Sequence, residues 1–196
     1  NEFIRLRFGS SLGNTVQSLE SLGTFGGLIN APYSINFIRE NNTWYALVLN
    51  NSTLVRLNFG NSLQNTPTAS LVTGPNGMLA SGCRKMVMAY ENNELIGVVT
   101  NATTRRIRLL NFRNSVTNNI TASDTVSSST LTFANNLYGI DIIRDCESWY
   151  GVASALNYGL FKINFGSVLY DNVMSTDSFS NITNVYDILV RQENAE

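Results

Sequence analysis

The stretch LVRLNFGNSLQN at residues 54–65 decides the fold, because versions of it recur along the whole chain. The related segments are FIRLRFGSSLGN from Phe3, IRLLNFRNSVTN from Ile107 and LFKINFGSVLYD from Leu160. They align on four phenylalanines spaced 51, 53 and 53 residues apart: Phe8, Phe59, Phe112 and Phe165. A fixed period of this length indicates a repeat architecture.

A second block alternates with the first. It reads YSINFIRENNTWYALVLNN from Tyr33, RKMVMAYENNELIGVVTNA from Arg84 and YGIDIIRDCESWYGVASAL from Tyr138, and a further copy begins at Tyr186. Each unit therefore contains four strand-like runs separated by Asn, Gly, Ser or Pro turns. In one unit we expect strands over residues 33–40, 44–50, 54–59 and 68–73.

A four-stranded antiparallel unit repeated at this period predicts a blade of a β-propeller. One blade cannot bury both of its faces, whereas stacked blades can. The predicted fold class is therefore all-β, a β-propeller of four-stranded antiparallel blades forming an incomplete ring of about four. Residues 1–196 form a single region, with repeat units at approximately 1–32, 33–83, 84–137 and 138–185 and the start of another at 186–196. We expect a piece of a longer chain or larger assembly; a self-contained four-bladed ring is the alternative.

The composition excludes several classes of protein. Hydrophobic residues make up 43% of the 196 residues and charged residues 14%, and the net charge is −1. The sequence has no clustered basic face of the kind that predicts nucleic-acid binding. It also has no apolar run near the roughly 20 residues of a transmembrane helix. Asn, Ser and Thr are abundant and only two lysines occur, a composition common in extracellular β-proteins.

The stretch NAPYSINFIRENNTWYALVLNNSTLVRLNFGNSLQNTPTASL, residues 30–71, resembles the propeller repeats of very large secreted proteins of Bacteroidota. Copies there read roughly WYGFVxN and LxRLxFGNSLxNTPT; more distantly, the chain resembles YVTN and NHL propellers. Here Arg113 replaces the motif glycine in the third copy. In that family such propellers stand beside PKD domains and a C-terminal type 9 secretion signal, and some members are associated with gliding motility and surface adhesion. The resemblance implies a secreted or cell-surface, outer-membrane-associated location, but no reaction.

The residue types offer little chemistry. The chain has no histidine, which removes Ser-His-Asp and Cys-His systems, and two cysteines without metal-ligand spacing. We therefore predict no catalytic residue, no cofactor, no metal and no enzymatic activity. One column of the repeat is acidic just after the first strand: Glu40, Glu91, Asp145 and Glu193. A cation at the channel mouth is one interpretation of this column, and solvated turn residues are the favoured one.

The predicted function is a non-catalytic module for adhesion, partner or glycan binding, or scaffolding. Binding is expected at the loops that depart from the repeat, Met78–Cys83 and Ser123–Asn136. We attribute the recurrent aromatic residues to packing between blades rather than to a ligand platform. The alternatives are a propeller enzyme with a carboxylate or metal site in its channel and a bacteriophage tail or receptor-binding protein.

Overall fold

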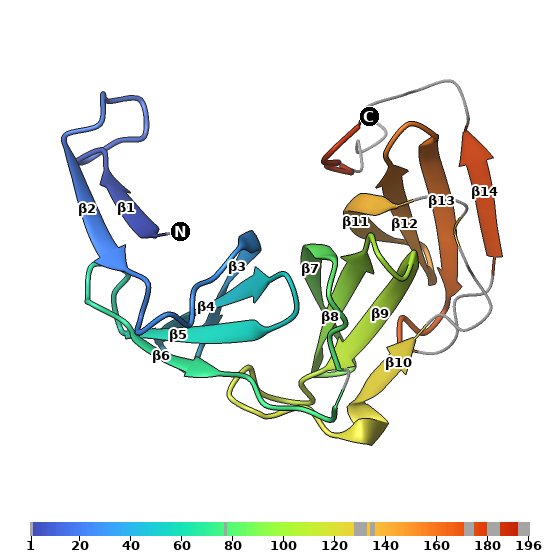
Figure 1. Ribbon diagram of the computed structural model, residues 1–196, viewed down its shortest axis with the longest axis horizontal. Coiled ribbons are helices and arrows are strands. Elements are labelled where there is room, and N and C mark those ends of the chain that lie inside the picture. Colours follow the sequence, from blue (N-terminus) through green and yellow to red (C-terminus); the bar gives the residue numbers. More distant parts are fainter. Residues whose placement is uncertain are drawn as a thin grey trace.

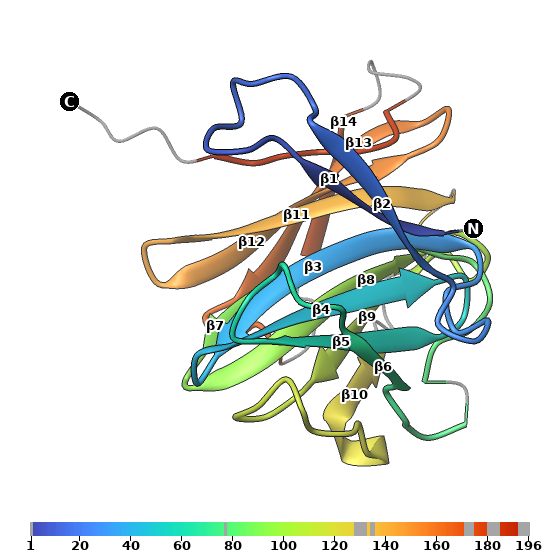
Figure 2. The same cartoon turned by 90° about the vertical axis from the view of Figure 1, so that its left-hand side faces the viewer.

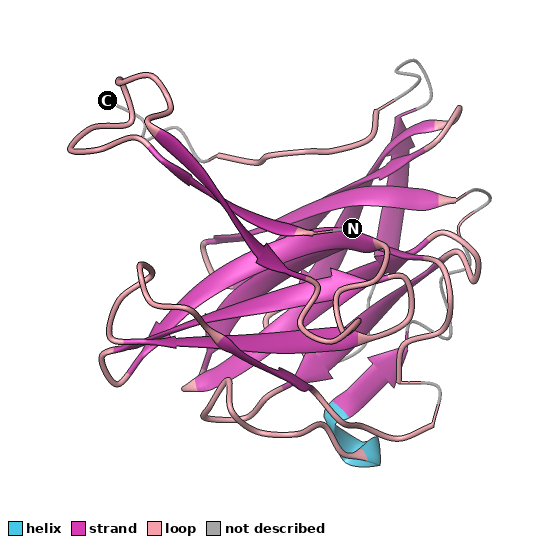
Figure 3. Ribbon diagram, turned by 60° about the vertical axis from the view of Figure 1, so that its left-hand side comes forward, coloured by secondary structure: helices cyan, strands magenta, loops and turns pink. Residues whose placement is uncertain are grey.

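The computed structural model describes residues 2–76, 78–127, 133, 136–170, 175–179 and 185–191, and these are built almost entirely of β-strands (Figure 3). A two-stranded sheet comes first, with β1 (Phe3–Arg7) and β2 (Ser18–Gly23). Three four-stranded sheets follow. Their strands are β3 (Pro32–Glu40), β4 (Thr43–Asn50), β5 (Leu54–Gly60) and β6 (Thr68–Leu71); β7 (Cys83–Glu91), β8 (Glu94–Asn101), β9 (Arg106–Asn111) and β10 (Thr125–Ser127); and β11 (Leu137–Asp145), β12 (Ser148–Ala155), β13 (Gly159–Gly166) and β14 (Ser175–Phe179). One 3-10 turn, η1 (Ala122–Asp124), precedes β10.

Each four-stranded sheet follows the order of the chain and is antiparallel throughout. The all-β class and the four strands per repeat are therefore confirmed. Asparagine pairs make the tight turn between the first two strands in the second and third sheets. Asn41 and Asn42 have φ of 47° and 63°, and Asn92 and Asn93 have φ of 50° and 64°. Two successive positive φ angles define the type I′ hairpin turn, which asparagine tolerates better than most residues.

The sheets lie next to one another in an arc, with β3, β7 and β11 along its inner side (Figure 1). Turned by 90°, they stand one behind another, face to face (Figure 2). Side chains of one sheet also bond to the backbone of the inner strand of its neighbour. Asn36 Nδ2 of β3 donates to the Met86 carbonyl of β7 at 2.9 Å, and Thr100 Oγ1 of β8 donates to the Tyr138 carbonyl of β11 at 3.1 Å.

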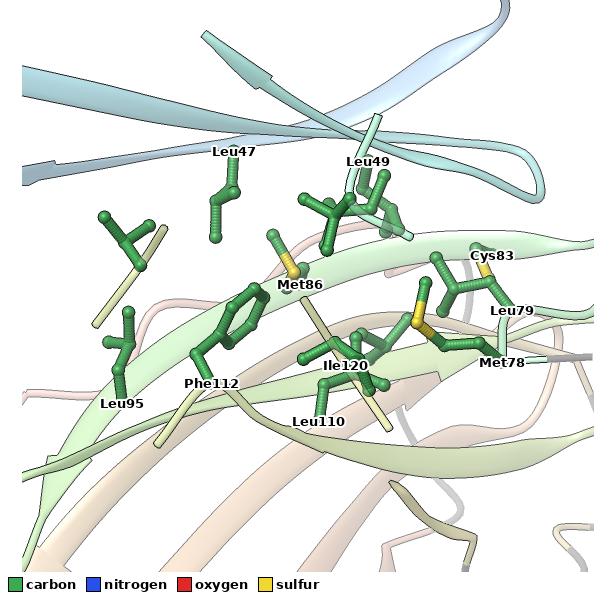
Figure 4. Packing of buried hydrophobic residues seen from close by; sticks show 14 of the residues in the cluster. Leu47, Leu49, Met78, Leu79, Cys83, Met86, Leu95, Leu110, Phe112 and Ile120 are labelled. Carbon is green, nitrogen blue, oxygen red and sulfur yellow. The ribbon is translucent and has the colours of Figure 1, made fainter. Parts of the chain in front are cut away.

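The hydrophobic core is divided among the spaces between successive sheets. Between the second and third sheets, Leu47 and Leu49 of β4 pack toward Met86 of β7 and Phe112 (Figure 4). Between the third and fourth sheets a matching cluster is centred on Phe165. Each sheet thus depends on its neighbours for burial, as expected of stacked repeats.

The recurring N-F-G sequence builds the loop after the third strand. Asn58 Oδ1 accepts a hydrogen bond from Gly60 N at 2.8 Å, and Asn65 Nδ2 donates to the Phe59 carbonyl at 2.8 Å. The later repeats reproduce the first bond with donors Arg113 N and Gly166 N, and the loop asparagines Asn14 and Asn118 reproduce the second. Gly60 has φ of 68°, a region that favours glycine, which explains the motif glycine.

The sequence predicted an inner strand starting at Tyr186, but residues 185–191 contain no strand. Val190 N instead donates to Asp141 Oδ2 of β11 at 2.7 Å, and Lys85 Nζ of β7 donates to Asp187 Oδ2 at 2.8 Å. Side chains, and not a backbone ladder, hold this segment. The described parts of the chain contain no helix long and apolar enough to cross a membrane.

Candidate functional site

Within the described residues, the acidic column forms no cation ring. Glu40 Oε2 accepts a hydrogen bond from Val116 N at 2.8 Å, and Val116 lies in the neighbouring sheet's loop after β9. Glu91 is 5% exposed and accepts hydrogen bonds from Trp149 Nε1 at 2.7 Å and from Leu169 N at 2.8 Å. No three His, Cys, Asp or Glu residues come together as metal ligands within the described ranges. Glu193 lies outside those ranges.

These carboxylates join one sheet to the next, and we call each such contact an inter-sheet latch. In a latch, the acidic residue that ends the inner strand of one sheet accepts a hydrogen bond from a backbone amide of the following sheet. That amide lies four residues after the aligned phenylalanine of the following sheet. The favoured interpretation, solvated turn residues, is therefore wrong for buried Glu91. It holds for Asp145, which is exposed and accepts a hydrogen bond from the Sγ of neighbouring Cys146. Arg56 reinforces the latch of Glu40 by donating to the Val116 carbonyl at 2.8 Å.

The predicted binding loop Met78–Cys83 is largely core. Met78, Leu79 and Cys83 are buried in the cluster between the second and third sheets, and Arg108 Nη1 donates to the Met78 carbonyl at 2.8 Å. The departure from the repeat here reflects packing, so the prediction of a binding surface at this loop is wrong. The second loop, Ser123–Asn136, is described only at 123–127, 133 and 136.

The described start of that second loop is fixed by an ion pair. Arg113 Nε donates to Asp124 Oδ1 at 3.0 Å, and Thr121 N donates to Asp124 Oδ2 at 2.8 Å. The hydrogen bonds from the Arg113 side chain, together with those from Thr121, outweigh the opposing effect of burial and lower the pKa of Asp124 to about 2.

We expect Asp124→Asn to lower the free energy of unfolding near neutral pH by about 1–2 kcal/mol. An unfolded aspartate has a pKa of about 3.9. The stabilisation is therefore fully present above about pH 4 and lost as the pH falls through about 2. Urea unfolding of both proteins at neutral pH, pH 4 and pH 2 should show the difference shrinking with acidity. Asp177→Asn, on exposed β14, is the matched control; a difference for Asp124→Asn that stays constant with pH would contradict the assignment.

An aromatic and cationic row emerges at the start of the inner strands. The Arg84 guanidinium carbon lies 4.3 Å from the ring centroid of Tyr33 and 5.6 Å from that of Tyr138. The Tyr138 and Tyr186 rings meet edge to face, with centroids 5.7 Å apart. Tyr33 is 48% exposed and Tyr186 is 62% exposed. We call Tyr33, Arg84, Tyr138 and Tyr186 the aromatic row.

One backbone carbonyl and one asparagine side chain hold the Arg84 side chain in place. Arg84 Nη1 donates to the Cys83 carbonyl at 3.0 Å and to Asn51 Oδ1 at 3.3 Å. These bonds use one end of the fork, and a guanidinium has five N–H donors in all. The row therefore combines flat apolar rings with a fixed cation on one edge of the molecule.

Sequence reasoning missed the row although its signal was present. The four residues occupy one column of the repeat, each opening the second block. Their recurrence was attributed to packing between blades. Trp149 and Phe112 are buried, as this predicts. The rings of the row also contact the neighbouring repeat unit, but Tyr33 and Tyr186 keep about half or more of their surface exposed.

No protein-family model and no curated protein matches the sequence. Two solved structures of an exo-β-1,3-galactanase from Phanerochaete chrysosporium are similar in fold. A variant with bound β-1,3-galactotriose is 10% identical with a TM-score of 0.54, and the match covers 75% of this chain and 35% of that one. The enzyme with galactose is 9% identical with a TM-score of 0.52, and the match covers 90% of this chain and 42% of that one.

The similar structures correct one prediction. The sequence predicted that the chain is not an enzyme, and this prediction is overturned because both similar structures are enzymes. The absence of histidine is too narrow a criterion for excluding an enzyme, because glycoside hydrolysis by a pair of carboxylic acids needs no histidine. This chain spans less than half of those chains, and at such low identity the likeness shows the fold alone.

Proposed function

We propose that this chain is an arc of β-propeller blades from a secreted cell-surface protein, and that it binds a glycan at the aromatic row. The stacked four-stranded sheets and the sequence repeat support the propeller. The Asn-, Ser- and Thr-rich composition and the resemblance to secreted Bacteroidota repeats support the location. Adhesion to a glycosylated surface would be the biological use of such a module.

The observation that carries the proposal is the row itself, with two half-exposed tyrosine rings beside an ordered guanidinium. Aromatic rings present flat apolar faces, which suit the C–H faces of sugars. Ligand sites typically combine such surfaces with a few fixed polar groups that orient the ligand, a part that the Arg84 donors would play. The sugar-bound galactanases guide the choice of first ligand, β-1,3-linked galacto-oligosaccharides.

Calorimetric titration of the intact chain with these oligosaccharides, and with a panel of other glycans, tests the proposal. We expect Tyr138→Ala to weaken binding about tenfold or more, consistent with loss of a central aromatic contact. Tyr90→Ala is the control, because Tyr90 is an exposed tyrosine at the opposite end of inner strand β7. Following reducing ends in the same samples shows whether the glycan is also cleaved.

Unchanged affinity in Tyr138→Ala would contradict the assignment of the site. So would an equal loss in Tyr90→Ala, or no binding across the whole panel. Thermal melting of both variants checks that a loss of binding does not come from unfolding.

A further inference from the structure

The third strand of each complete sheet has neighbours on both sides. Among the described residues, β1, its counterpart in the first sheet, pairs with β2 alone. The other edge of β1 borders an apolar groove of about 780 Å³. Ile35 and Phe37 of β3 line the far side of this groove. A free strand edge beside an apolar surface is a template for pairing with another strand.

The repeats show what covers the equivalent surface elsewhere. Ile35 is 41% exposed, whereas Met86, at the same position of β7, is 1% exposed. Leu47 and Leu49 of β4, the second strand of the preceding sheet, pack over Met86 (Figure 4). Ile140 of β11 is likewise buried, in a cluster with Ile96 and Val98 of β8. In both cases the second strand of the preceding sheet supplies the cover.

A backbone amide in the groove wall also indicates that strands of a preceding sheet would fit here. Leu63 lines the groove and occupies the position of Val116 and Leu169, whose amides bond to Glu40 and Glu91. In the described part of the chain, no acceptor is found for the Leu63 amide. Its carbonyl is already engaged, because Arg5 Nη1 donates to it at 2.6 Å, just as Arg56 binds the Val116 carbonyl. The first sheet therefore contacts the second as the second contacts the third, through an arginine bonded to the loop carbonyl. The carboxylate that would accept the hydrogen bond of the Leu63 amide is missing from the described residues.

We propose that this groove is the docking site for an antiparallel β-hairpin of the same type as β3–β4. Its second strand pairs with the free edge of β1, and the apolar side chains of that strand cover Ile35 and Phe37. Its first strand ends in Asp or Glu, which accepts the hydrogen bond of the Leu63 amide. The inference does not depend on glycan binding at the aromatic row.

The test is a fusion that supplies this hairpin to the full chain. A copy of residues 32–51 is placed directly before Asn1, so that the copied Asn51 with Asn1 and Glu2 forms a turn as long as Asn51–Thr53. We expect amide exchange of the β1 edge and of Leu63 to slow at least about tenfold, with a higher urea midpoint. Exchange is read residue by residue by NMR.

Two matched fusions separate the parts of the proposal. Changing the copied Glu40 to Ala should leave β1 protected but return Leu63 to fast exchange. Changing the copied Leu47 and Leu49 to Ser should remove both effects. Unchanged exchange of β1 and Leu63 in the first fusion would overturn the proposal. A dimer of the unfused chain in which β1 and Leu63 are already protected would overturn it too, because the occupant would then be a second copy.

Discussion

Glu91→Ala is expected to lower the free energy of unfolding by about 2–5 kcal/mol. The carboxylate is buried and is the acceptor for Trp149 Nε1 and for Leu169 N, so its removal leaves two buried donors without an acceptor. Each unpaired buried group costs about 1–3 kcal/mol, and the lost side chain also leaves a void. Urea unfolding followed by far-UV circular dichroism measures the loss.

The repeat provides its own controls for this variant. Glu40 is half-buried and accepts one inter-sheet hydrogen bond, so Glu40→Ala should cost about 1 kcal/mol. Exposed Asp145 has no described partner in another sheet, so Asp145→Ala should change stability by less than about 0.5 kcal/mol. Equal losses in the three variants would contradict the latch, because one repeat column would then have one effect whatever its contacts.

Phe112→Ala is the second variant with a large expected effect, a loss of about 3–5 kcal/mol. Phe112 is fully buried between the second and third sheets, in the same cluster as Leu47 and Met86. Phe8→Ala is the matched control, since Phe8 occupies the same column but stays partly exposed beside the groove. We expect it to cost about 1 kcal/mol, in proportion to the smaller area it buries.

Chemical denaturation of both variants distinguishes packing from sequence motif. If the phenylalanine served the local loop alone, both variants would lose similar stability, because Asn14 and Asn118 donate alike to the Phe8 and Phe112 carbonyls. A loss in Phe8→Ala as large as in Phe112→Ala would therefore show that stacking between sheets is not its main role.

The sequence predicted what depends on contacts within one repeat. Four strands per unit and the asparagine turns follow from local patterns, and the structure contains both. The acidic column could not be interpreted in this way, because the backbone amides that bond to Glu40 and Glu91 lie 76 and 78 residues further along the chain. When the amides that face these carboxylates are unknown, a column of acidic residues suggests side chains that are exposed to solvent or that bind a cation.

The loop Met78–Cys83 shows a second limit. Its departure from the repeat suggested a variable surface, yet its Met, Leu and Cys side chains are those that fill cores. The aromatic row shows the reverse case, because a recurring tyrosine looked like packing and two of the three rings are largely exposed. The apolar composition of Met78–Cys83 could have corrected the interpretation of that loop as a surface. Only the placement of the inner strands could correct the interpretation of the recurring tyrosine.

Residue-resolved amide exchange of the unmodified chain tests most directly whether the sheets are stacked through inter-sheet latches. Val116 and Leu169 donate to carboxylates of the preceding sheet, whereas Leu63 occupies the same loop position without a described acceptor. We predict that Val116 and Leu169 exchange at least about tenfold more slowly than Leu63, and that Glu91→Ala accelerates Leu169 but not Val116. If all three amides exchange equally fast in the unmodified chain, the sheets are not joined in this way.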